Sequence, residues 1–177
     1  MLNPKKKGIG IFGGSFDPPH KGHVAISKIS FRKLRIKKVL WIITKRNPFK
    51  KKAYFSLQER ILKSNKLTKK YKFIDILHLE DKIKSSRTID IVNYFTKIKK
   101  QKDLYLILGS DNLLKFHKWT SWKKIVKLTK LVVFSRKGYD KKSKESLVVK
   151  YLNKKNIFFV NNKQINVSSS YIRKNIQ

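Results

Sequence analysis

Residues 13 to 23 read Gly13-Gly14-Ser15-Phe16-Asp17-Pro18-Pro19-His20-Lys21-Gly22-His23. The apolar run at residues 9–12 precedes them, so we expect a buried strand that ends in a glycine pair. Two prolines then keep the chain extended, because proline breaks a helix and disfavours helical angles in the residue before it. A helix is therefore expected to open at His20 to His23. Backbone N–H groups and the positive end of a helix dipole converge in such a loop, which suits it to hold phosphate.

The two histidines give this loop a chemical role. His20 and His23 are three residues apart, so at a helix start their rings occupy neighbouring faces and both can donate N–H groups to phosphate oxygens. A single histidine on a helix is more often structural, but a pair inside a phosphate loop favours function. We interpret the stretch as a cradle for a nucleoside triphosphate.

The composition indicates one ordinary folded domain, which we place at residues 1–177. Of these 177 residues, 40% are hydrophobic, which is enough for a buried core. The absence of cysteine excludes disulfides, thiolate chemistry and cysteine-ligated zinc, and it fits a cytoplasmic location. No apolar run approaches the roughly 20 residues that cross a bilayer, so we expect no membrane partner.

The formal net charge of +35 raises the alternative of a nucleic-acid-binding protein. The lysines, however, are spread through nearly every expected helix and loop, with only short runs at residues 5–7, 50–52 and 141–142. Such a spread is typical of a compositional bias at exposed positions. We therefore expect a general attraction for anionic substrates and no specific nucleic-acid partner.

Six short apolar runs predict the fold class. They are continuous rather than alternating, which is typical of strands buried on both faces of a parallel sheet. The runs lie at residues 9–12, 39–44, 73–77, 104–108, 131–135 and 157–160. Helical patterns at residues 22–34, 56–67 and 88–99 fall between them, the second opening with the capping box Ser56-Leu57-Gln58-Glu59. This alternation predicts an α/β fold with a doubly wound parallel sheet.

Ligands of such sheets bind beyond the carboxyl ends of the strands, where the strand order reverses. Unusual glycine and polar residues follow the expected strands at that edge. They are the loop at residues 13–23 after the first strand, Asn47 after the second, Gly109 and Asp111 after the fourth, and Arg136 after the fifth. We expect the functional site at this edge.

Residues 8–13 also fit the dinucleotide-binding pattern G-x-G-x-x-G, because they read GIGIFG. We reject that interpretation, since the pattern must lie in the turn after a strand and lead straight into a helix. Here Gly8 and Gly10 fall at or within the expected strand, and the two prolines prevent the helix. The phosphate is expected to be held in another way.

Several motifs of the chain resemble those of one family. The stretch GGSFDPPHKGH at residues 13–23 resembles the signature of H-x-G-H nucleotidyltransferases, in the form found in nicotinate-nucleotide adenylyltransferases. VSSSYIR at residues 167–173 is similar to the second phosphate motif of that superfamily, and GSDNLL at residues 109–114, followed by Trp119, is similar to its G-x-D segment. Asn47-Pro48-Phe49-Lys50, Arg87-Thr88 and Arg136-Lys137-Gly138 follow in the expected order. The resemblance spans nearly the whole chain and implies a Rossmann-like fold of the nucleotidyltransferase type.

The resemblance also implies a reaction. This is adenylyl transfer from ATP to nicotinate mononucleotide, which gives deamido-NAD and pyrophosphate in NAD biosynthesis. Catalysis is assigned to His20, His23 and Arg173. ATP binding is assigned to Gly13, Gly14, Ser15, Phe16, His20, His23, Gly109, Asp111, Ser168, Ser169 and Arg173. Binding of the mononucleotide is assigned to Asn47, Lys50, Thr88, Trp119 and Arg136.

Physical chemistry leaves two readings for some of these residues. Ser168 and Ser169 either only cap a helix or also free N–H groups for phosphate, with Arg173 adding a planar donor fork. Trp119 either packs in the core or stacks on a flat pyridine ring, and the resemblance favours stacking. The backbone N–H of Thr88, at an expected helix start, suits a carboxylate, and the resemblance points to that of nicotinate.

The sequence signals no metal site held by the protein. We expect Mg²⁺ to arrive with ATP, held mainly by phosphate oxygens, with Asp17 contributing through water. The expected partners are ATP and nicotinate mononucleotide, and a homo-oligomer is left open. Two alternative functions also stay open: a phosphopantetheine adenylyltransferase, and a basic RNA-binding protein on a nucleotidyltransferase scaffold. The sequence does not distinguish the acid from the amide form of the mononucleotide.

Overall fold

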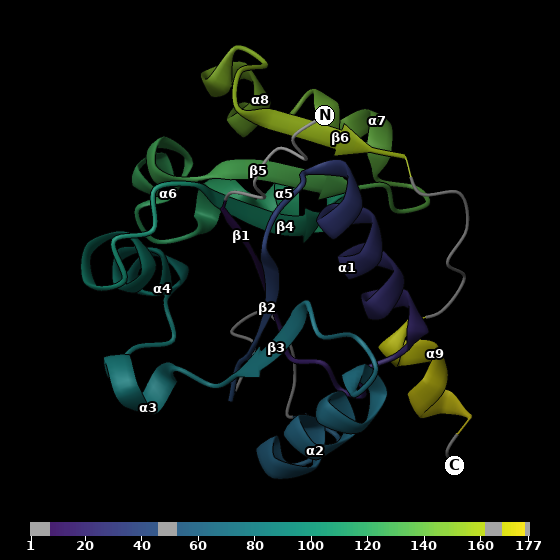
Figure 1. Ribbon diagram of the computed structural model, residues 1–177. Helices are drawn as coiled ribbons and strands as arrows, with labels where there is room; N and C mark the ends of the chain where they lie inside the picture. Colours follow the sequence, from purple (N-terminus) through teal and green to yellow (C-terminus); the bar gives the residue numbers. More distant parts are fainter. Residues whose placement is uncertain (1–7, 46–52, 162–167, 176–177) are drawn as a thin grey trace, which may run out of the picture.

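A parallel sheet of six strands forms the centre of the computed structural model, which describes residues 8–45, 53–161 and 168–175 (Figure 1). The strands are β1 (Ile9–Gly14), β2 (Lys38–Ile43), β3 (Ile74–Leu77), β4 (Leu104–Gly109), β5 (Lys130–Phe134) and β6 (Ile157–Val160). Each of them coincides with one of the six apolar runs. The prediction of a doubly wound parallel sheet is therefore confirmed.

Helices connect the strands. They are α1 (Lys21–Lys33), α2 (Leu57–Thr68), α3 (Glu80–Ile83), α4 (Thr88–Asn93), α5 (Ser110–Lys115), α6 (Trp122–Leu128), α7 (Asp140–Lys144), α8 (Leu147–Leu152) and α9 (Ser169–Lys174). A π-helical turn, Tyr94–Ile98, extends α4, and a 3₁₀ turn, Phe116–Lys118, extends α5. The predicted capping box opens α2, since the amide of Glu59 donates to the hydroxyl of Ser56 and the amide of Ser56 donates to the carboxylate of Glu59. Among the described residues, no helix is long and apolar enough to span a membrane.

The two faces of the sheet carry separate cores. Helices α1 and α2 cover one face, where Val24 of α1 packs in a cluster with Val39, Trp41 and Ile43 of β2. Helices α4, α5, α6 and α8 cover the other face. Because successive side chains of a strand point to opposite faces, a strand buried on both faces has no polar alternation. This explains why the runs are continuous in the sequence.

The strand order is β3-β2-β1-β4-β5-β6, so it reverses between β1 and β4. The loops after these two strands therefore lie at the switch point. Gly10 lies inside β1, where an added Cβ would come within 2.8 Å of the Ile107 side chain and 2.9 Å of the Ile36 side chain. This glycine allows close packing in the sheet and does not form a phosphate-binding turn, which confirms the rejection of the G-x-G-x-x-G pattern.

Trp41 of β2 supports, from the core, the loop between β1 and α1 that is predicted to hold phosphate, called the phosphate loop below. The side chain is fully buried, its indole ring stacks on Phe16 with centroids 4.7 Å apart, and its Nε1 donates to the hydroxyl of Ser27 at 2.8 Å. The Ser27 hydroxyl in turn donates to the carbonyl of His23 at 2.9 Å. A residue of the second strand thus helps to hold both the loop and the start of α1.

Replacing Trp41 by Ala should lower the free energy of unfolding by about 3–5 kcal/mol, because it leaves a cavity and removes the indole donor. Denaturant unfolding followed by far-UV circular dichroism measures the loss. Trp122→Ala is the control, since this half-buried side chain lies near the surface on α6 and its loss should cost clearly less. Equal losses for the two variants would contradict the supporting role of Trp41.

Candidate active site

The loop between β1 and α1 forms the floor of the site. Gly13 is exposed, and a Cβ built on it would meet no atom within 4 Å, so the backbone there borders open space. Phe16 does the opposite: its φ of 47° lies in the left-handed region, and its ring is only 2% exposed. Such a backbone is strained for a residue with a side chain and persists where burial holds it. Phe16 therefore anchors the loop with its buried ring, and only its backbone is left for the ATP binding that is predicted for this residue.

The rings of His20 and His23 cap the start of α1 by accepting hydrogen bonds from backbone amides. The amide of Gly22 donates to Nδ1 of His20, and the amide of His20 donates to Nδ1 of His23, both at 3.1 Å. The two rings are stacked with centroids 3.8 Å apart. Because Nδ1 accepts in each ring, the proton of each neutral imidazole is on Nε2. The pair therefore presents two N–H donors of the kind that phosphate oxygens accept.

Burial keeps His20 neutral. The loss of hydration, and after it the positive charge of Arg136, lower the pKa of His20 from 6.5 to about 4. Protonation would also break the hydrogen bond from Gly22, since Nδ1 would no longer accept. At neutral pH this ring acts as a hydrogen-bond donor rather than as a cation.

The C-terminal motif meets this loop although it is far away in the sequence. Ser168 caps α9 by accepting from the amide of Tyr171 at 3.1 Å. The hydroxyl of Ser169 donates to the carbonyl of Pro18 at 2.9 Å, across 151 positions of the chain, and Arg173 donates to the carbonyl of Asp17. Figure 1 shows α9 beside the start of α1. The structure thus brings both predicted phosphate motifs to one place.

The loop after β4 is joined to the loop after β5 by an ion pair and hydrogen bonds. The Arg136 guanidinium forms an ion pair with the carboxylate of Asp111 at 2.6 Å. The amide of Arg136 donates to the buried hydroxyl of Ser110 at 3.0 Å and to the carboxylate of Asp140 at 2.9 Å. A Cβ on Gly109 would lie 2.5 Å from an oxygen of Asp111, so a larger residue there would displace this carboxylate from its present position. The spacing of the G-x-D segment has here a steric cause.

Two of the residues assigned to the pyridine nucleotide, Thr88 and Trp119, belong to the face of the sheet that α4, α5, α6 and α8 cover. Thr88 is the first residue of α4, after Arg87 in extended conformation. Trp119 is half-buried, with its ring stacked on the fully buried ring of Phe116 at 4.6 Å between centroids. One face of the indole therefore belongs to the core, while stacking of Trp119 on a pyridine ring stays a prediction. Asn47 and Lys50 lie outside the described residues.

Arg60 of α2 is a buried charge that the sequence analysis missed. The side chain is 1% exposed, and it lies on the buried stripe of α2 with Ser64 and Thr68. A charged residue on the buried stripe of an amphipathic helix is a sequence signal, because such a charge needs partners. Its hydrogen-bond partners lie in loops, and the periodicity of apolar residues in the sequence does not predict where these loops lie relative to α2.

Together, the sheet and its switch point define the class of the protein. A doubly wound sheet that carries an H-x-G-H loop and a facing serine-arginine helix is a nucleotidyltransferase, and the cytidylyltransferase-like family model matches residues 11–175. Two solved structures of Plasmodium falciparum nicotinic acid mononucleotide adenylyltransferase, complexed with APC and with NaAD, match with a TM-score of 0.75. These matches cover 95% of this chain and 83% of theirs, at 20% and 23% identity, and show the common fold.

Sequence relatives define the family more narrowly. A Pelagibacter ubique protein named "probable nicotinate-nucleotide adenylyltransferase" is 47% identical over 173 residues, which cover 98% of this chain and 96% of the relative. A protein of the same name from Aquifex aeolicus is 36% identical over 168 residues, covering 90% and 98%. The chain belongs to the nicotinate-nucleotide adenylyltransferase family.

Replacing His20 by Asn should change how stability depends on pH, because asparagine can cap α1 but does not titrate. Unfolded His20 binds a proton below about pH 6.5 and folded His20 only below about pH 4, so the unfolded state holds more protons between these values. The stability of the wild type relative to His20→Asn should therefore be highest above pH 6.5 and should fall toward pH 4.

Urea unfolding of both proteins at pH 7.5 and 4.5 measures this difference. His117→Asn is the matched control, since its side chain is exposed on the surface. A difference between wild type and His20→Asn that stays constant across this range would show that His20 is not held neutral.

Proposed function

We propose that the chain transfers the adenylyl group of ATP to nicotinate mononucleotide. A phosphate oxygen of the mononucleotide attacks the α-phosphorus, the bond from that phosphorus to the bridging oxygen breaks, and pyrophosphate leaves with deamido-NAD as the other product. The membership in the family supports this reaction. The observation that carries it is the contact of Ser169 and Arg173 with the loop at Asp17 and Pro18. This contact brings together the two segments whose hydrogen-bond donors are assigned to the phosphate groups of ATP.

The site suits a reaction that needs alignment and charge stabilisation more than covalent help. The Nε2–H groups of His20 and His23, and the N–H groups of the Arg173 guanidinium that do not bind Asp17 or Ser170, are donors that can stabilise negative charge developing on the leaving pyrophosphate. Removing one such preorganised donor typically costs about 3–4 kcal/mol in the transition state. No covalent intermediate with the enzyme is required.

Mg²⁺ belongs to ATP in this proposal. The two carboxylate oxygens of Asp17 accept the amides of Tyr54 and Phe55 at 2.8 and 2.9 Å, and the side chain is buried. Asp17 thus serves the loop, and its contribution to Mg²⁺ through water stays a prediction. Within the ranges that the structure describes, no three His, Cys, Asp or Glu side chains gather as metal ligands. The oxygens of the triphosphate would hold the ion, and the ion would partly neutralise their negative charge.

Thr88 and Trp119 are proposed to select the pyridine substrate. The amide at the start of α4 suits the nicotinate carboxylate, and the indole, fixed on one face by Phe116, offers a flat surface to the ring. Arg136 lies close enough to His20 to lower the pKa of that histidine. The positive charge of Arg136 therefore acts on the proposed ATP site as well as on its ion-pair partner Asp111.

A pyrophosphate-release assay with ATP and three acceptors tests the function. We expect turnover with nicotinate mononucleotide, and comparison with nicotinamide mononucleotide gives the preference for the acid or the amide. Turnover with phosphopantetheine alone would make the chain a phosphopantetheine adenylyltransferase. No pyrophosphate release, together with salt-sensitive retention of RNA, would favour the RNA-binding alternative.

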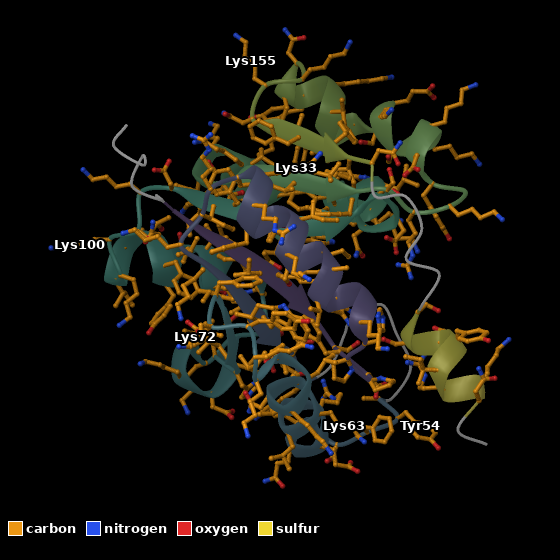
Figure 2. All side chains as sticks on the ribbon, turned by 45° about the vertical axis from the view of Figure 1, so that its right-hand side comes forward. Lys33, Tyr54, Lys63, Lys72, Lys100 and Lys155 are labelled. Carbon is orange, nitrogen blue, oxygen red and sulfur yellow. The ribbon has the colours of Figure 1, made fainter. Side chains whose placement is uncertain are left out.

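The labelled lysines of the described residues do not gather on one nucleic-acid-binding face. Figure 2 shows labelled lysines on widely separated parts of the molecule: Lys33, Lys63, Lys72, Lys100 and Lys155. A polynucleotide site needs basic side chains gathered on one face or groove.

Replacing His20 by Ala should lower kcat about 100- to 1,000-fold, because one preorganised donor to the pyrophosphate is lost. The far-UV circular dichroism spectrum should stay that of the wild type, which shows that the fold is intact. His117→Ala is the matched control and should keep wild-type turnover. Full activity in His20→Ala would remove this residue from the mechanism.

A further inference from the structure

Arg60 is a buried cation without a role in the proposed chemistry. Burial lowers the pKa of its guanidinium, while the nearby carboxylates of Asp17 and Glu80 act in the opposite direction. Arginine nevertheless keeps its proton in proteins, so a positive charge stays in the interior. Such a charge is costly unless hydrogen bonds satisfy it.

Four backbone carbonyls satisfy Arg60. Its Nη1 donates to the carbonyls of Ser15 at 2.6 Å and Thr44 at 2.8 Å, its Nη2 to that of Lys45 at 3.1 Å, and its Nε to that of Phe55 at 3.1 Å. These carbonyls belong to three segments: the phosphate loop, the end of β2 and the entry to α2. One planar group therefore joins the ends of two strands to a helix start.

Asp17 completes the same connection from the loop side. Its carboxylate accepts the amides of Tyr54 and Phe55, next to the carbonyl that Arg60 holds, and its own carbonyl accepts from Arg173. A continuous chain of hydrogen bonds thus leads from Arg60 through the entry of α2 and the phosphate loop to α9.

The bond to Ser15 has a consequence for the phosphate loop. A trans peptide is planar, and its C=O and N–H groups point in opposite directions. Because the Ser15 carbonyl is held toward the buried guanidinium, the N–H of Phe16 points away from Arg60. The guanidinium therefore sets the direction of an amide in the loop that is assigned to ATP.

We propose that Arg60 is a positioning residue for adenylyl transfer, which orients the amides of the phosphate loop and fixes that loop against the end of β2. This inference rests on the proposed function. Arg60 would not touch ATP, so its loss should misalign the reacting groups more than it weakens binding. A misplacement of about 1 Å in the reacting groups can lower a rate about 100-fold.

Arg60→Lys tests the proposal, because lysine keeps the charge but donates from one nitrogen, whereas arginine reaches the four carbonyls from three separate nitrogens of a planar fork. We expect kcat to fall about 100-fold, with the KM for ATP changed less than about threefold. Arg32→Lys, an exposed substitution on α1, is the matched control and should behave as wild type. Steady-state kinetics are measured well below the midpoint of thermal unfolding of each variant.

Arg60→Met is the second variant, since an apolar side chain of similar length can replace a buried ion without unfolding a protein. It should show the same fall in kcat. A folded variant with normal kcat, a change confined to KM, or a failure of both variants to fold would each overturn the positioning role. A wild type inactive with every acceptor would instead overturn the proposed function, and the inference with it.

Discussion

The whole site depends on the hydrogen bonds that the C-terminal helix makes to two carbonyls of the phosphate loop. Ser169 and Arg173 donate to Pro18 and Asp17, and they connect parts of the chain that lie 151 positions apart in the case of Ser169 and Pro18. In the proposed function, the histidines would face a triphosphate alone without this contact. With it, donors from both ends of the chain lie at the switch point between β1 and β4.

The donors are also fixed before any substrate arrives. The backbone amides of Gly22 and His20 hold the rings of His20 and His23 in one tautomer each, while the buried ring of Phe16 and the guanidinium of Arg60 hold the loop from the core. The strained backbone of Phe16 is offset by the stacking of its ring on Trp41. Donors held in this way need little reorganisation when charge develops, which is the main source of electrostatic catalysis.

Much of this could be predicted from the sequence, because the signals are local. Continuous apolar runs predict the six strands, and contiguous motifs predict the two segments that meet at the site. The partners across the fold could not be predicted: the ion pair of Asp111 with Arg136, and the carbonyls around Arg60, join loops that are adjacent only once the strand order is known. The amides that the carboxylate of Asp17 accepts could not be predicted for the same reason, since they lie 37 and 38 positions further on.

The most direct measurement of the central claim is a crystal structure of the chain with a non-hydrolysable ATP analogue. We predict that β- and γ-phosphate oxygens lie within about 3.2 Å of Nε2 of His20, and that Ser169 and Arg173 bind the same triphosphate. A triphosphate that contacts only one of the two motifs, or that lies away from both, would contradict the account.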